Sequence, residues 1–248
     1  MIYLDNSATT KPCAAALEAM TNALTAQWGN PSALYDFGLD AARALRTARG
    51  QVAAAMGAEP GRVFFTSGGT EADNWAVFSS AKKLGKRGKH IVTTAVEHHA
   101  ILNCMKELEA QGYTVTYLQP DGEGRISLDA LSQALARDTI LVSIMMVNNE
   151  TGAAMPIAQM AKLVHRVCPE AIFHTDAVQA YAHVPINVDE YHIDMLSVSG
   201  HKFNGPKEIG FLYMRTGSKL RSFIHGGAQE RKRRAGTENV PGIVGFGK

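Results

Sequence analysis

The segments AIFHTDAVQA, residues 171–180, and MLSVSGHKFNGPKEIGFLY, residues 195–213, decide the fold of this chain. Each begins with a short apolar run typical of a strand and continues into polar residues, Asp176 in the first segment and Lys202 in the second. Open α/β sheets bind their ligands beyond the carboxyl ends of the strands. The two segments therefore predict neighbouring strands that present an acid and a lysine at one edge of a sheet.

Outward from these segments, strand-like and helix-like stretches alternate along the chain. This alternation is typical of a mostly parallel sheet covered by helices on both faces, so we expect a three-layer α/β/α fold. The opening of the chain is predicted to be extended. Further strands are expected at residues 63–65, 91–92, 114–118, 140–147 and 210–214, and helices at 38–57, from about 71, 100, 127 and 157, and beginning again near 240.

Composition sets limits on the class of protein. A chain of 248 residues, 46% of them hydrophobic, can form one large α/β domain, and a net charge of +2 does not indicate a nucleic-acid partner. RKRR, residues 231–234, is predicted to be a solvated, flexible loop. Three widely spaced cysteines favour neither disulfides nor a metal site and fit a reducing cytoplasm. Neither a secretion signal nor a membrane span is predicted.

Lys202 is the first candidate for chemistry. A partly desolvated lysine can hold an aldehyde as a Schiff base and later move a proton as a general base. Polar and turn-forming residues flank it and favour a shaped loop over a solvated charge. Ser199 to Lys202 also matches the S-x-x-K pattern of serine acyl-enzymes, although Gly205 and Pro206 would end the helix that this pattern normally opens.

Asp176 is the second candidate. A carboxylate at this strand end can pair with a protonated ring nitrogen, and Gln179, three residues on, would lie on the same side. The alternative is a helix N-cap, in which Asp176 only accepts hydrogen bonds from backbone N–H groups.

A phosphate cradle is predicted in TSGGTEADNWA, residues 66–76. Gly68, Gly69 and Thr70 stand between a strand and a helix, where free backbone amides attract an anion and glycines allow it to approach. The segment lacks the Walker lysine and the GxGxxG spacing, which favours a small monophosphate over a nucleotide. The alternative is a glycine-rich turn that binds no ligand.

Two further loops supply polar groups at strand ends. His98 or His99 offers a flat ring over a cofactor and a group for proton transfer. A metal site formed with His174 and Asp176 is the alternative, but it leaves Lys202 without a role. NNETG, residues 148–152, offers amides, as an ordinary turn also would. Together the loops provide the contacts that pyridoxal phosphate requires.

With these residues in place, the chain resembles the cysteine desulfurases of the NifS and IscS type, which belong to the class V branch of the fold type I pyridoxal-phosphate enzymes. The resemblance runs from YLDNSATT, residues 3–10, to RRAGTENV, residues 233–240. It implies an enzyme that converts L-cysteine to L-alanine and an enzyme persulfide. A selenocysteine lyase or another class V enzyme is the closest alternative, and a Ser–Lys hydrolase or a non-catalytic truncated scaffold are alternatives of other classes.

The resemblance also implies a role for each matching position. Lys202 corresponds to the Schiff-base lysine, and His98 rather than His99 to the ring-stacking histidine that assists proton transfer. Thr237 corresponds to a residue that reaches the phosphate of a neighbouring subunit, which implies a homodimer. The cofactor-binding positions are Gly69, Thr70, His98, Asn149, Asp176, Gln179, Ser199, His201, Lys202 and Thr237, and no metal is implied.

The resemblance further implies how the chain is organised. Residues 1–12 correspond to a segment of the small domain and residues 13–248 to the large, cofactor-binding domain. The C-terminal small domain, with the persulfide-forming cysteine and the arginine for the substrate carboxylate, is not in this sequence. The implied partners are L-cysteine, a second copy of the chain and a sulfur-acceptor protein such as an iron–sulfur scaffold, in the cytoplasm and without nucleic acid or membrane.

Overall fold

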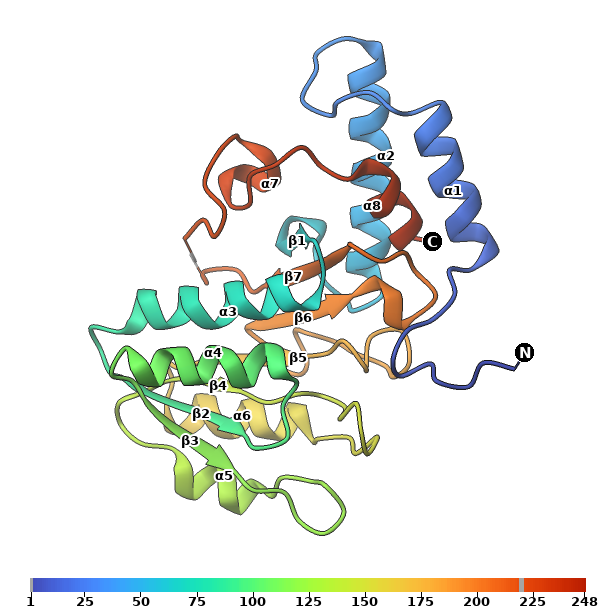
Figure 1. Ribbon diagram of the computed structural model, residues 1–248. Helices are drawn as coiled ribbons and strands as arrows, with labels where there is room; N and C mark the ends of the chain where they lie inside the picture. Colours follow the sequence, from blue (N-terminus) through green and yellow to red (C-terminus); the bar gives the residue numbers. More distant parts are fainter. Residues whose placement is uncertain (1, 219–220) are drawn as a thin grey trace.

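A computed structural model describes residues 2–218 and 221–248 of the chain (Figure 1). The strands are β1 (Val63–Thr66), β2 (His90–Thr94), β3 (Thr114–Leu118), β4 (Thr139–Ser143), β5 (Ile172–Asp176), β6 (Met195–Ser199) and β7 (Gly210–Met214). The helices are α1 (Ala14–Thr25), α2 (Asp36–Ala54), α3 (Gly69–Leu84), α4 (His99–Ala110), α5 (Leu128–Ala134), α6 (Ile157–Val167), α7 (Gln229–Lys232) and α8 (Val240–Phe246), with 3₁₀ turns η1 (Pro60–Arg62) and η2 (Gly200–Lys202). Among these described helices, none has the length and apolar character needed to cross a membrane.

Within the described residues, the strands form a single seven-stranded sheet in the order β1-β7-β6-β5-β4-β2-β3. Only β7 runs antiparallel to its neighbours, β1 and β6, and the remaining pairs are parallel. The carboxyl ends of β1, β2, β4, β5 and β6 therefore lie at the same edge of the sheet. The loops that the sequence predicted to carry chemistry follow these five ends, except the loop of Thr237, which comes after β7.

Helices cover both faces of the sheet, and two hydrophobic cores result (Figure 1). On one face, Trp75 of α3 and Met105 of α4 are fully buried. On the other face, Met160 of α6 and Val52 of α2 pack in the same core as Phe173 of β5. The three-layer α/β/α fold with a mostly parallel sheet, predicted from the sequence, is confirmed.

The apolar run at residues 140–147 forms a shorter strand than predicted, because β4 ends at Ser143. Beyond that point the backbone still donates to β5, from Ile144 N to His174 O (3.1 Å). On the side where β4 pairs with β2, the acceptor beyond Ser143 is the Glu97 carboxylate, which accepts a hydrogen bond from Met145 N (2.9 Å). The Glu97 side chain thus replaces the backbone of β2 as hydrogen-bond acceptor, and regular strand pairing ends at Ser143.

Helix α1 was not predicted, because its sequence AAALEAMTNALT has few large apolar residues. Cys13 caps it, since its Sγ accepts a hydrogen bond from Ala16 N at 3.4 Å. Only two small residues, Ala16 and Ala23, are buried on this helix. It packs beside α8, which in turn packs against α2.

The solvated loop predicted for RKRR is only partly correct, because Arg231 and Lys232 are exposed but Arg233 and Arg234 are half-buried. Arg231 donates to Val63 O at 2.6 Å, and its guanidinium lies 4.2 Å from the centre of the Phe64 ring. Arg234 forms two hydrogen bonds, of 2.8 and 2.9 Å, with the carboxylate of Glu71. Arg231 and Arg234 thus bind this loop to β1 and to the first turn of α3. Sequence spacing did not reveal these contacts.

Candidate active site

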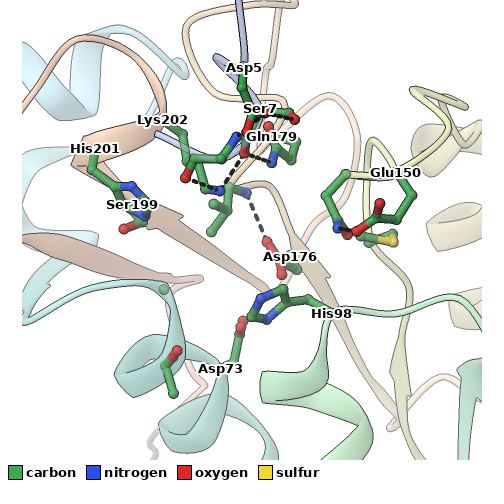
Figure 2. A pocket seen from close by; sticks show the side chains of 16 residues that line it. Asp5, Ser7, Asp73, His98, Glu150, Asp176, Gln179, Ser199, His201 and Lys202 are labelled. Atoms are coloured by element: carbon green, nitrogen blue, oxygen red, sulfur yellow. Dashed lines mark hydrogen bonds between the residues drawn. The ribbon is translucent and has the colours of Figure 1, made fainter. Parts of the chain in front are cut away.

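A cavity of about 390 Å³ opens at the carboxyl edge of the sheet (Figure 2). It contains acids, a lysine, hydroxyl groups and imidazoles, contributed by six segments of the chain. The predicted residues that line it are Gly69, Thr70, His98, Asn149, Asp176, Gln179, Ser199, His201 and Lys202. Cavity-lining residues that the sequence did not single out are Asp5, Ser7, Ala8, Asp73, Met145, Glu150 and Val178.

Lys202 ends the short turn η2 that follows β6. Its Nζ donates hydrogen bonds to Ser7 O (2.5 Å) and Ala8 O (2.9 Å). Partial burial lowers the pKa of Lys202 below its ordinary value, although Asp176 and other nearby carboxylates act in the opposite direction. More of the amine is therefore uncharged than in a solvated lysine, as a nucleophile requires.

The N-terminal segment lies along the loop that carries Lys202. Thr10 N donates to His201 O at 2.7 Å, and Cys13 N donates to Asn204 O at 2.9 Å. Gln179 adds a hydrogen bond from its Nε2 to Ser7 O (2.9 Å). Residues near the start of the sequence therefore form one wall of the cavity, and no local pattern could have predicted this.

Asp176 lies at the base of the cavity, at the end of β5, and is 4% exposed. Burial raises the pKa of this carboxyl, while the Val178 amide, which donates to Oδ1 at 2.8 Å, and the charge of Lys202 act to lower it. The predicted N-cap alternative accounts for the hydrogen bond from Val178 N to Asp176, but it does not account for the position of Asp176 at the cavity. A buried carboxylate that faces a cavity suits a cationic atom of a ligand.

The start of α3 offers the cavity a site that suits an anion. The amides of the first turn of α3 have no acceptors within the helix, and Thr70, Ser199 and His201 line the same cavity. A side chain at Gly69 would place its Cβ 2.8 Å from Cγ2 of Val178, so only glycine allows this close packing. Among these residues, Ser199 is buried and Thr70 is exposed.

His98 lines the cavity, whereas His99 faces a separate groove beside α3 and α4. The Nδ1 of His98 accepts a hydrogen bond from Ala100 N at 3.1 Å and so caps α4. A neutral ring must then carry its proton on Nε2. Asn149 donates from Nδ2 to Glu150 Oε1 at 2.7 Å, and both residues reach the cavity from the loop after β4.

Two buried acids near the site escaped the sequence analysis. Asp73 is 1% exposed and lines the cavity from α3. Glu97 is 4% exposed, and its Oε1 accepts hydrogen bonds from Thr94 Oγ1 (2.8 Å) and Met145 N (2.9 Å). Burial raises the pKa of Glu97 to about 8. Spacing gives no signal for either acid, since Glu97 resembles an ordinary polar residue of a loop and Asp73 one of a helix.

Thr237 lies apart from the other predicted residues. It is exposed and lines a smaller hollow, of about 70 Å³, together with residues such as Thr66 and Arg234. Its predicted contact is with a neighbouring subunit, and that role stays a prediction.

The geometry disfavours two alternatives. No hydrogen bond joins Ser199 to Lys202 in the described part of the chain, so the S-x-x-K pair is not assembled as an acyl-enzyme would need. His174 is fully buried, and its ring nitrogens contact the hydroxyls of Ser143 and Ser197, each at 2.9 Å. The ring thus has no nitrogen left to share in a metal site with His98 and Asp176.

The chain is similar to known proteins over its whole length. The family model described as aminotransferase class-V matches residues 2–248. The chain is 51% identical to the cysteine desulfurase IscS of Methanosarcina thermophila and 52% identical to a cysteine desulfurase of Trichormus azollae. All of this chain aligns in both comparisons, but only 61% of each relative does.

Solved structures give the same result. A NifS-like protein superposes with a TM-score of 0.97 at 40% identity, over 99% of this chain and 67% of the other. The structure described as SspA in complex with cysteine superposes with a TM-score of 0.95 at 39% identity, over 100% of this chain and 71% of the other.

Proposed function

The chain belongs to the aminotransferase class-V family, and from this premise we propose that it acts as a pyridoxal-phosphate-dependent cysteine desulfurase. The reaction would convert L-cysteine to L-alanine and transfer the sulfur to a thiol as a persulfide. Relatives that carry the name cysteine desulfurase, about half identical in sequence, support the activity. The chain spans 61% of their length, so the activity of the whole protein is part of the proposal.

The family depends on pyridoxal phosphate, and the cavity fits that group at three places. Asp176 offers a buried carboxyl for a cationic ring nitrogen. The α3 N-terminus offers amides, with Ser199 and His201 beside it, for a phosphate. Lys202 offers an amine of lowered pKa for an aldehyde. We propose that Gly69, Thr70, His98, Asn149 and Gln179 complete the set, with His98 against the ring.

When bound, the cofactor supplies an aldehyde that combines with amines and a cationic ring that withdraws electrons. Asp176 would keep the ring nitrogen protonated, and Lys202, once released by the substrate amine, would move the proton of the substrate α-carbon. His98, with its proton on Nε2, would assist that transfer. The sulfur must leave to a thiolate: it forms a bond to the acceptor sulfur as its bond to the substrate carbon breaks.

The accepting thiol must come from outside the cavity, because no cysteine of the described chain lines it. Burial raises the pKa of Cys104 to about 12 and also raises that of Cys168, so these thiols are poor nucleophiles. We propose two partners: a protein that receives sulfur for iron–sulfur assembly, and a second copy of the chain, with which Thr237 would reach the neighbouring phosphate.

We further propose that residues 1–12 belong to a small domain and that the protein is located in the cytoplasm.

The observation that carries the proposal is the juxtaposition of buried Asp176 with Lys202 in one cavity. The test is the visible absorption spectrum of the purified chain with pyridoxal phosphate, before and after L-cysteine. We expect a band of protein-bound cofactor that changes on addition of cysteine, together with alanine release when dithiothreitol is present to accept the sulfur. A chain that binds the cofactor but releases no alanine would contradict the desulfurase activity.

Selenocysteine is the alternative substrate, since the cavity has no group that distinguishes sulfur from selenium. Parallel measurements of alanine release from L-cysteine and L-selenocysteine separate the two activities. A rate with cysteine that is negligible beside the rate with selenocysteine would favour a lyase.

A further inference from the structure

A second buried carboxyl lies beside Asp176 and has no assigned role. Asp73 projects from the first turns of α3 toward the base of the cavity (Figure 2). It is 1% exposed, and its Oδ1 has no hydrogen-bond partner among the described residues. An ionised carboxylate in that position would be desolvated with one hydroxyl, that of Ser197, and no cation to compensate it, which is a costly arrangement in a folded protein.

The groups around Asp73 do not supply a positive charge. Nε2 of His174 lies 3.7 Å from Oδ1, but burial lowers the pKa of His174 to about 3, so the ring is neutral and the contact is not an ion pair. Ser197 contributes a hydroxyl. The remaining titratable groups that act on Asp73 or are acted on by it are Asp176, Glu97 and Cys104, all of which are neutral or negative.

Asp176 has a better environment for a negative charge. Its Oδ1 accepts a hydrogen bond from Val178 N at 2.8 Å, and the charge of Lys202 favours its ionised form. Asp73 has neither an amide nor a cation. Burial and the charge of Asp176 raise the pKa of Asp73 well above its usual range, as expected when two acids share one buried site.

We propose that Asp73 is a positioning residue that carries the single proton of a buried acid pair, so that Asp176 alone is ionised toward the cavity. The pair then presents one negative charge to one cationic ring nitrogen, and the neutral Asp73 acts only through Asp176. This consequence for the cofactor rests on the proposed function. The location of the proton on Asp73 does not depend on the proposed function, because it follows from the arrangement of the protein's own residues.

Infrared spectroscopy of the complete chain, labelled with ¹³C at the aspartate side-chain carboxyls, locates the proton directly. We expect one carbonyl band of a protonated, buried aspartic acid at neutral pH. Asp73→Asn should remove this band, whereas Asp176→Asn and the exposed control Asp129→Asn should retain it. Absence of the band from the parent protein, or its loss in Asp176→Asn with retention in Asp73→Asn, would overturn the proposal.

Two further measurements keep the test decisive. If Asp73→Asn does not fold, Ser197→Ala should still shift the band, because it removes the hydroxyl that contacts Asp73; an unshifted band would overturn the proposal. In titrations with pyridoxal phosphate, Asp73→Asn should bind within about twofold of the parent, since asparagine is also neutral, and Asp176→Asn should bind at least about tenfold more weakly.

The two hypotheses fail in different ways. If the parent chain binds no pyridoxal phosphate, the proposed function fails, while the infrared bands still decide whether Asp73 holds the proton. If the parent binds the cofactor and Asp73→Asn weakens binding as much as Asp176→Asn does, Asp73 is ionised and the inference about it is wrong.

Discussion

Lys202 is surrounded by oxygen atoms that act on its charge in opposite ways. The carbonyl groups of Ser7 and Ala8 hold its ammonium form, as do the carboxylates of Asp5 and Asp176, while burial favours the neutral amine. Burial has the larger effect, so the pKa of Lys202 is lowered. A nucleophile that is both held in place and partly neutral is suited to a reaction with an aldehyde.

Replacement of Lys202 by alanine should abolish covalent retention of pyridoxal phosphate. After incubation with the cofactor and reduction with borohydride, mass spectrometry should find one added cofactor on the parent chain, at Lys202, and none on Lys202→Ala. The exposed Lys207 is the matched control, and Lys207→Ala should retain the modification. A cofactor found on Lys207 in the parent would contradict the assignment of Lys202.

Replacement of Gly69 by alanine should weaken cofactor binding about tenfold and lower the free energy of unfolding by about 1–3 kcal/mol, since overpacking must displace Val178 or the start of α3. Fluorescence titration and urea unfolding measure the two effects. Gly61→Ala is the control, because a Cβ there meets no atom within 4 Å. Equal behaviour of both variants would argue against a tight cradle at Gly69.

At the scale of elements, a buried ion pair joins the loop after β7 to α2 and β1. Arg49 of α2 and Glu230 of α7 form hydrogen bonds of 2.6 and 2.7 Å, and Glu230 also accepts one from Phe65 N at 3.0 Å. Glu230 and the two residues that follow it have positive φ angles of 43°, 58° and 64°, which side chains disfavour. The contacts of Glu230 and Arg231 hold this turn in place.

Glu230→Ala should therefore destabilise the protein by about 3–5 kcal/mol, because it leaves the guanidinium of Arg49 buried without its partner. Urea unfolding monitored by circular dichroism measures the change. Asp40→Ala, which removes the partner of Arg43 in an exposed pair, should change stability by only about 0–1 kcal/mol. A similar small effect of Glu230→Ala would show that the loop is held by other contacts.

The sequence predicted the strands better than the contacts between distant loops. Strand β3 is rich in β-branched and aromatic residues and has turn signals on both sides, and its bounds, Thr114–Leu118, were predicted without error. Helix α1 was missed because it buries only alanines. The basic run at residues 231–234 was partly misjudged because its partners, Val63, Phe64 and Glu71, lie more than 150 residues earlier in the sequence.

For the candidate site, the sequence identified the residues that directly follow strands, and nine of the ten predicted positions line one cavity. Asp73 and Glu97 were not found, since their burial depends on how α3 and the loops pack rather than on any local pattern.

At the scale of the whole molecule, buried acids link stability to pH. The folded state raises the pKa of Glu97 from its usual 4.5 to about 8, so between these values the folded protein holds a proton that the unfolded chain has released. Stability from this group is complete below pH 4.5 and is lost as the pH rises through 8.

The free energy of unfolding of the cofactor-free chain should therefore decrease as the pH rises from about 5 to 8, with Glu97 contributing a slope of about 1.4 kcal/mol per pH unit. Glu97→Gln, which keeps an acceptor for Thr94 and Met145, should flatten this dependence. Urea unfolding at a series of pH values measures it. Parallel curves for the parent and Glu97→Gln would contradict a protonated Glu97.

The contact between Lys202 and Ser7 joins residues 195 positions apart in the chain, and the cavity wall is built on it. Closing so long a loop costs chain entropy before the contact is formed. We therefore expect this wall to form slowly and late in folding. A ribosome must synthesise the chain past Lys202 before this lysine can meet Ser7. We therefore expect the lysine to acquire its shielded environment only after β6 has been synthesised, and binding of the proposed cofactor to follow that step.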